Sequence, residues 1–283
     1  MERPITFTTE MLQSAAKGKL LKFWKLNSPD RPRKFPWKPV EILPQKDPEQ
    51  MSRVIEIIGP SGAGKTEAVN FLGHKFSQNL NIIIAPELVV YDGEGNVEDW
   101  GKDHKLKGLM LGEFGIKHQM LIWDNIKLLS HMYHVAELIK NRMQKRLIIE
   151  RGANDAISTQ PFTQPEHYSI RYDPIYERDF LTHTFQSIAL AEDVDAVILF
   201  GTNWKTTRKR RVDSGEKPEG NLINRKNWPE IMSGYEWWLG SFYPIFRKRN
   251  GMGLLIVDGR DDLNANNQKI LEYCQKVFVM QGS

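Results

Sequence analysis

Eight consecutive residues have the types and the spacing of a phosphate-binding loop. They are Gly59, Pro60, Ser61, Gly62, Ala63, Gly64, Lys65 and Thr66, which match G-x-x-x-x-G-K-[ST] in full. Glycines let backbone N–H groups approach phosphate oxygens, Lys65 can reach the β- and γ-phosphates, and Thr66 can offer a hydroxyl to Mg²⁺. An apolar run precedes the loop and a helix-compatible stretch follows it, as this motif requires. The sequence therefore predicts binding of a nucleoside triphosphate, with ATP and Mg²⁺ as cofactors.

A carboxylate and an arginine stand at the end of the apolar run 146–150. Glu150 is the last residue of the run, Arg151 follows it directly, and Asp155 comes four residues after Arg151. Ligands of open parallel sheets bind at the carboxyl ends of strands. We expect Glu150 to orient Mg²⁺ or its water molecules and Arg151 to hold a phosphate or the acceptor. An ordinary strand end at the surface is the alternative.

A cluster of basic residues follows a later apolar run, within residues 204–220. Its six members, Lys205, Arg208, Lys209, Arg210, Arg211 and Lys217, fall within thirteen positions. Arginines on a mobile lid can neutralise the charge of a transferring phosphoryl group while they exclude water. The pattern favours such a lid, with Arg208, Arg210 and Arg211 as its catalytic candidates. A solvated helix face and a contact with nucleic acid are the alternatives.

One further carboxylate is a candidate general base. Glu87 follows the apolar run 82–85 and Pro86. A carboxylate at a strand end can accept the proton of an attacking hydroxyl. The alternative is an ordinary loop glutamate.

The apolar runs that carry these residues alternate with helical patterns. The runs are 54–58, 81–85, 146–150, 195–201 and 253–258, and the helical patterns are 65–76, 120–143, 179–191, 228–249 and 263–280, the fourth interrupted by Pro244. Short apolar runs are typical of parallel strands that are buried on both faces. We predict an α/β fold, a three-layer sandwich around a five-stranded, mostly parallel sheet.

Composition excludes several classes of protein. The 283 residues are 40% hydrophobic and 26% charged, which suits a soluble protein with a large core. Cys274 is the single cysteine, so neither a disulfide within the chain nor a cysteine-based zinc cluster is possible. No apolar run approaches the roughly 20 residues of a membrane-spanning helix. Residues 1–9 lack the apolar core of a signal peptide. We expect a cytoplasmic protein without membrane contact.

The positive charge lies in the first fifty residues. They hold ten Lys and Arg against six Asp and Glu, which is the whole net charge of +4. Five prolines between Pro29 and Pro44 favour extended backbone, and Phe35 and Trp37 indicate packing on the body. We predict an N-terminal extension, 1–50, before a P-loop domain, 51–283. The extension is a solvated arm or, alternatively, a contact for nucleic acid.

The order of these motifs resembles the deoxynucleoside kinase and thymidylate kinase group of P-loop kinases, over about residues 53–260. The resemblance implies that Glu87 activates the sugar hydroxyl and that Glu150 and Arg151 match a Glu-Arg-Ser motif, with Gly152 in place of Ser. It also implies substrate contacts by Asp155 and by a tryptophan after the second strand. Trp100 is the candidate for this tryptophan, behind an intervening stretch from Tyr91 that has the turn formers of a hairpin.

The resulting prediction is a kinase that transfers the γ-phosphoryl group of ATP to a nucleoside or nucleotide. Two alternatives remain: a kinase for a hydroxyl carried in DNA or RNA, and a nucleotide-dependent switch or regulatory ATPase. The sequence shows no clear Asp-Glu pair at a strand end, which counts against the switch. A homodimer is compatible with the sequence.

Overall fold

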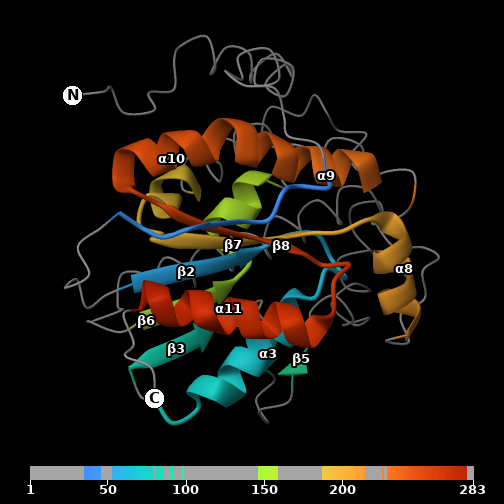
Figure 1. Cartoon of the computed structure of the whole chain (residues 1–283), viewed down its shortest axis with the longest axis horizontal. Helices are drawn as coiled ribbons and strands as arrows, with labels where there is room; N and C mark the ends of the chain where they lie inside the picture. Colours follow the sequence, from blue (N-terminus) through green and yellow to red (C-terminus); the bar gives the residue numbers. More distant parts are fainter. Residues whose placement is uncertain are drawn as a thin grey trace, which may run out of the picture.

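A six-stranded sheet forms the centre of the molecule (Figure 1). The computed structural model describes residues 35–45, 53–79, 81–85, 90–91, 97–98, 146–158, 187–213, 225 and 228–278, and the statements below concern these residues. The strand order is β1-β8-β7-β2-β6-β3. The strands are β1 (Val40–Ile42), β2 (Arg53–Ile58), β3 (Ile82–Ala85), β6 (Arg146–Glu150), β7 (Ala196–Gly201) and β8 (Gly253–Asp258).

Five of these strands are parallel, and β2 lies between β6 and β7. Every residue of β2 and of β7 is buried, as expected for apolar strands that are covered on both faces. The chain leaves β2 toward β3 on one side and later returns to β7 on the other. The carboxyl end of β2 is therefore a topological switch point, where open α/β sheets bind their ligands.

The sheet has one strand more than the five that the sequence predicted, and this additional strand is β1. β1 pairs antiparallel with β8, with Val40 opposite Ile256, and it belongs to the N-terminal segment rather than to the parallel set. Trp37 joins the apolar core with 6% of its surface exposed. The predicted packing of the aromatic residues on the body is thus confirmed for residues 35–45. A three-residue strand next to Pro39 has too weak a pattern to be recognised from sequence.

Helices cover both faces of the sheet, which confirms the three-layer α/β sandwich (Figure 1). On one face lie α3 (Lys65–Phe76) and α11 (Leu263–Val277). On the other lie α9 (Trp228–Trp237), a π-helical turn (Trp238–Phe242) and α10 (Tyr243–Asn250). One more helix, α8 (Trp204–Asp213), follows the end of β7 and covers neither face.

The elements predicted within the described residues are close to those observed. The interruption expected at Pro244 is instead the π-helical turn, and Pro244 occupies the first turn of α10, where its missing N–H costs nothing. Residues 187–191 of the predicted helix 179–191 are helical, and its other residues, like the helix at 120–143, lie outside the described residues. None of the described helices has the length and apolarity to cross a membrane.

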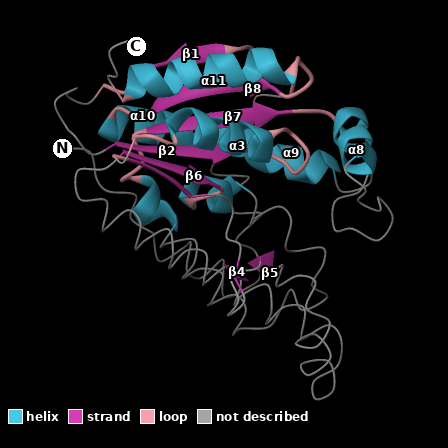
Figure 2. Cartoon of the chain, turned by 90° about the horizontal axis from the view of Figure 1, so that it is seen from below, coloured by secondary structure: helices cyan, strands magenta, loops and turns pink. Residues whose placement is uncertain are grey.

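The predicted hairpin after the second parallel strand is confirmed. β4 (Val90–Tyr91) and β5 (Val97–Glu98) pair antiparallel, with Val90 opposite Glu98. This small sheet lies apart from the main one (Figure 2).

Candidate active site

The phosphate loop has the backbone conformation that its glycines allow. Gly59, Gly62 and Gly64 have φ values of 139°, 71° and 107°. A Cβ atom at Gly59 would lie 2.5 Å from the carbonyl oxygen of Phe200, so no other residue fits there. The loop leads directly into α3, whose first backbone bond runs from Ala68 N to Gly64 O at 3.1 Å. The free N–H groups of this helix start form an anion site.

Lys65, the residue predicted to reach the phosphates, contacts the backbone of the loop. Its Nζ donates to Gly59 O at 2.7 Å and to Pro60 O at 3.0 Å, and the residue is 4% exposed. The ammonium group therefore lies against the backbone carbonyls at the start of the loop. This is the position from which a lysine can reach phosphate oxygens.

Thr66, in the first turn of α3, and Glu150, the last residue of β6, come together. Thr66 Oγ1 donates to Glu150 Oε1 at 2.9 Å, and Glu150 is 1% exposed. Hydroxyl and carboxylate oxygens are ligands that Mg²⁺ accepts, and Mg²⁺ takes few protein ligands because it retains water and phosphate oxygens. These two residues fit the predicted ion. Within the described residues, no group of three or more His, Cys, Asp or Glu forms a separate metal cluster.

The basic segment forms α8, and this helix packs on the phosphate loop. Arg210 Nη1 donates to Ala63 O at 2.8 Å and to Gly62 O at 3.3 Å. Partial burial lowers the pKa of Arg210, an effect that Glu67 opposes, yet a guanidinium stays charged at neutral pH. Among the three predicted arginines, Arg210 is thus the one whose contacts with the loop are established.

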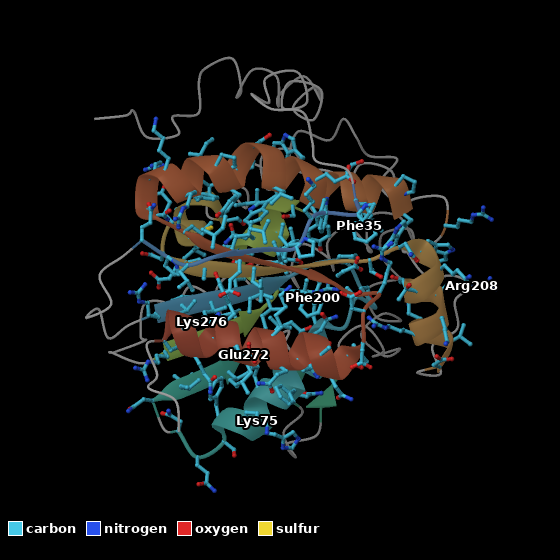
Figure 3. The ribbon with its side chains drawn as sticks, viewed as in Figure 1. Phe35, Lys75, Phe200, Arg208, Glu272 and Lys276 are labelled. Atoms are coloured by element: carbon cyan, nitrogen blue, oxygen red, sulfur yellow. The ribbon has the colours of Figure 1, made fainter. Side chains whose placement is uncertain are left out.

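The other two arginines have different positions on α8. Arg211 is buried, with 7% of its surface exposed. Arg208 is exposed and projects away from the sheet (Figure 3). The positions of the three arginines on α8 therefore do not favour a shared role at one phosphate.

Arg151 and Asp155 flank the base of the loop. Arg151 has a φ of 56°, which is rare for a residue other than glycine, and its N–H donates to Ile57 O at 3.0 Å. Asp155 Oδ1 accepts from Gly59 N at 3.2 Å and from the Tyr235 hydroxyl at 2.8 Å. The structure thus connects Asp155 to the loop backbone. Its predicted contact with substrate stays a prediction, as does the phosphate contact of Arg151.

Sequence reasoning missed Glu56, a fully buried carboxylate in β2. Glu56 Oε1 accepts from Asp155 N at 2.9 Å, and Oε2 accepts from Asn154 N at 3.0 Å and from Asn154 Nδ2 at 2.8 Å. Burial raises the pKa of Glu56 to about 7, although these hydrogen bonds oppose the rise. The available signal was a glutamate inside an otherwise apolar strand.

Glu56 also accounts for Gly152, the residue that departs from the Glu-Arg-Ser motif. A Cβ atom at Gly152 would lie 2.9 Å from Glu56 Cδ. A serine would therefore collide with the buried carboxylate. Asn154, in turn, accepts from Trp238 Nε1 at 3.0 Å, so the network extends to the helical layer.

Three predicted features lie outside the described residues. They are the candidate base Glu87, the candidate substrate residue Trp100 and the distal part of the predicted lid, 214–220. Their roles stay predictions.

Comparison with known proteins gives matches among solved structures. No family model matches the chain, and no curated protein matches it. The thymidylate kinase from Ehrlichia chaffeensis is similar, with 16% sequence identity, a TM-score of 0.43, and coverage of 79% of this chain and 98% of that one. The deoxyadenosine kinase from M. mycoides with bound dCTP has 17% identity, a TM-score of 0.49, and coverage of 79% and 100%. The functional argument therefore rests on this chain's own residues.

Proposed function

We propose that the protein is an ATP- and Mg²⁺-dependent kinase that transfers the γ-phosphoryl group to a nucleoside or nucleotide acceptor. The observation that carries this proposal is the convergence of three groups on one loop. The Lys65 ammonium, the Thr66–Glu150 pair and the Arg210 guanidinium all contact residues 59–66 or belong to them. Phosphoryl transfer depends on such positioning and charge neutralisation.

Each group has a separate task in this reaction. The loop amides and Lys65 hold the β- and γ-phosphates. Thr66 and Glu150 would hold Mg²⁺, which would supply positive charge to neutralise the phosphates. Arg210 lies against the loop, and its charge would neutralise the transferring phosphoryl group. A bond forms between the acceptor oxygen and the γ-phosphorus, while the β–γ bridging bond breaks and ADP leaves with the electron pair.

The acceptor's proton requires a base. Glu87 is the proposed base, because in the sequence it follows β3 by two residues, and the carboxyl end of β3 lies at the same edge of the sheet as the loop. The class of acceptor is proposed from the order of the motifs along the chain. It includes free nucleosides and their monophosphates.

A labelling experiment tests this function. Purified protein is incubated with γ-labelled ATP, Mg²⁺ and one of three acceptor pools: nucleosides, nucleoside monophosphates or oligonucleotides. We expect label in one of the first two pools and loss of that label with Lys65→Ala. Phosphate release that is the same with and without every acceptor would overturn the kinase and favour the regulatory ATPase.

A second candidate function is a kinase for a hydroxyl carried in DNA or RNA. The observation that favours it is a pocket of about 800 Å³ on the outer side of α8. Its lining includes Trp204 and four basic residues, Lys205, Arg208, Lys209 and Arg225, against one acidic residue, Asp213. Cations attract a phosphodiester backbone, and an indole ring can stack on a base.

The two candidates differ in their response to salt. Removal of two cations by Arg208→Ala and Lys209→Ala would flatten the salt dependence of oligonucleotide binding by a slope of about 2 in a log–log plot. For a kinase of small nucleosides, the same double variant would leave the acceptor KM unchanged. Label in oligonucleotides alone, together with the flatter slope, would establish the second candidate.

A further inference from the structure

Glu56 is a buried titratable group for which the proposed reaction has no use. It is 0% exposed, and its neighbours along the strand face, Val54 and Ile58, belong to the apolar core. A carboxylate in such a layer is costly unless several donors satisfy it. Its presence therefore calls for an explanation beyond packing.

The donors to Glu56 all come from one place. They are the N–H of Asn154, the side-chain amide of Asn154 and the N–H of Asp155. Residues 153–158 are helical, so the two N–H groups belong to the first turn of this short helix. Glu56 thus holds the start of the helix against the centre of β2. Gly152 has no side chain, and this leaves the space that the carboxylate of Glu56 occupies.

Asp155 carries this restraint to the phosphate loop. Its N–H donates to Glu56, and its own Oδ1 accepts from Gly59 N at 3.2 Å. The Tyr235 hydroxyl donates to the same oxygen at 2.8 Å. Gly59 is the first residue of the loop. Its N–H is thus bonded to a side chain whose own backbone is held by Glu56.

We propose that Glu56 is a positioning residue for the phosphate loop, acting through Asp155 on the backbone N–H of Gly59. This inference rests on the proposed function in one respect, since the loop is taken to bind nucleotide. The competing explanation is that Glu56 supports only the general stability of the core. The two differ because a positioning role loosens the loop selectively, whereas a general role weakens all elements alike.

Glu56→Gln is the decisive variant. It keeps the size of the side chain but replaces one of its two acceptor oxygens with an N–H₂ group. That group cannot accept a hydrogen bond, so either the bond from Asp155 N or the bonds from Asn154 are lost. Glu272→Gln on the exposed surface of α11 is the matched control (Figure 3). Both variants are compared with the wild type at pH 8, above the pKa of about 7, where Glu56 is ionised. Among the described residues, the negative charge of Asp155 also raises the pKa of Glu56.

Amide hydrogen exchange provides the first readout and needs no nucleotide. We expect the segment 57–66 to exchange about tenfold faster in Glu56→Gln, while α11 exchanges as in the wild type. Equal acceleration in both segments, or none in 57–66, would overturn the positioning role. If Glu56→Gln does not fold, Tyr235→Phe tests the same network, because it removes the second donor to Asp155. The same selective acceleration is then expected, and its absence would overturn the proposal.

Nucleotide affinity provides the second readout. The dissociation constant of a non-hydrolysable ATP analogue with Mg²⁺ should rise about tenfold in Glu56→Gln, the effect of losing one charge-assisted hydrogen bond. An unchanged affinity together with unchanged exchange would contradict the positioning role. A wild-type protein that binds no nucleotide would instead overturn the proposed function, and the exchange result alone would then decide the role of Glu56.

Discussion

Thr66 and Glu150 are 84 residues apart in the chain, yet Thr66 Oγ1 donates to Glu150 Oε1 at 2.9 Å. Parallel pairing of β2 with β6 creates this contact, because it sets Ile57 opposite Glu150 and so brings the end of β6 beside the phosphate loop. The hydroxyl belongs to the last residue of the loop, and the carboxylate belongs to the last residue of β6. Strand register thus brings together the two oxygens that we propose as ligands of Mg²⁺.

This relationship predicts a coupled effect on the requirement for Mg²⁺. Thr66→Val and Glu150→Gln should each raise the Mg²⁺ concentration for half-maximal activity by about tenfold or more. If both side chains serve one ion, the double variant will be only slightly worse than either single variant. Titration of phosphoryl transfer with Mg²⁺ measures both effects. Fully additive effects would contradict a shared ion.

Lys65 should be essential where a nearby lysine is not. Lys65→Ala removes the cation inside the loop and should reduce phosphoryl transfer by at least about a hundredfold, because charge neutralisation at the transition state is lost. Lys75→Ala is the control, since Lys75 is exposed on the same helix and lies over the Phe71 ring, 5.5 Å from its centroid. Steady-state rates with saturating ATP measure the difference. Equal losses in the two variants would refute the assignment of Lys65.

Arg210 should act on the rate more than on ATP binding. Its guanidinium contacts the carbonyl oxygens of Gly62 and Ala63, which places a positive charge beside the proposed phosphate site. We expect Arg210→Ala to lower kcat by about a hundredfold, with a change in the KM for ATP of less than about fivefold. Initial rates over a range of ATP concentrations separate the two parameters. A large rise in KM at constant kcat would assign Arg210 to ground-state binding instead.

Two glycine substitutions should have opposite effects on stability. Gly152→Ala places a methyl group 2.9 Å from Glu56 Cδ and should destabilise the fold by about 1–3 kcal/mol. Gly73→Ala lies in α3 with no atom within 4 Å of the added Cβ, so it should stabilise the fold by about 0.5–1 kcal/mol. Denaturant titration of each variant measures the free energy of unfolding. Stability gained at Gly152 would contradict the close contact with Glu56.

The buried carboxylate predicts a pH-dependent stability. Burial raises the pKa of Glu56 from 4.5 to about 7 in the folded protein, so folding favours its protonated form. The associated stability is fully present below pH 4.5 and is lost as pH rises through 7. A shift of this size corresponds to at most about 3 kcal/mol. Denaturant titrations at pH 5 and pH 8.5 measure the effect. From the lower to the higher pH, the free energy of unfolding of the wild type should fall relative to that of Glu56→Gln. Parallel pH profiles of the two proteins would contradict the raised pKa.

Local patterns were sufficient for much of the fold and for the centre of the site. The helix at Lys65–Phe76 and the strand Arg146–Glu150 have the predicted bounds, because apolar periodicity and a glycine-rich turn are encoded in adjacent residues. Antiparallel β1 was not recognised, since three residues beside Pro39 carry no distinctive period. Its pairing depends on β8, more than 200 positions later in the chain.

The sequence by itself determined the phosphate loop, its lysine and its hydroxyl, because the chemistry of that loop requires particular residue types at fixed spacing. Only the tertiary structure decided which of the basic residues of α8 meets the loop, because the rotation of a helix about its axis is set by packing rather than by composition. It also decided the burial and the hydrogen-bond partners of Glu56. Whether a carboxylate is buried, and which backbone groups donate to it, depends on segments about a hundred residues away that fold against its strand.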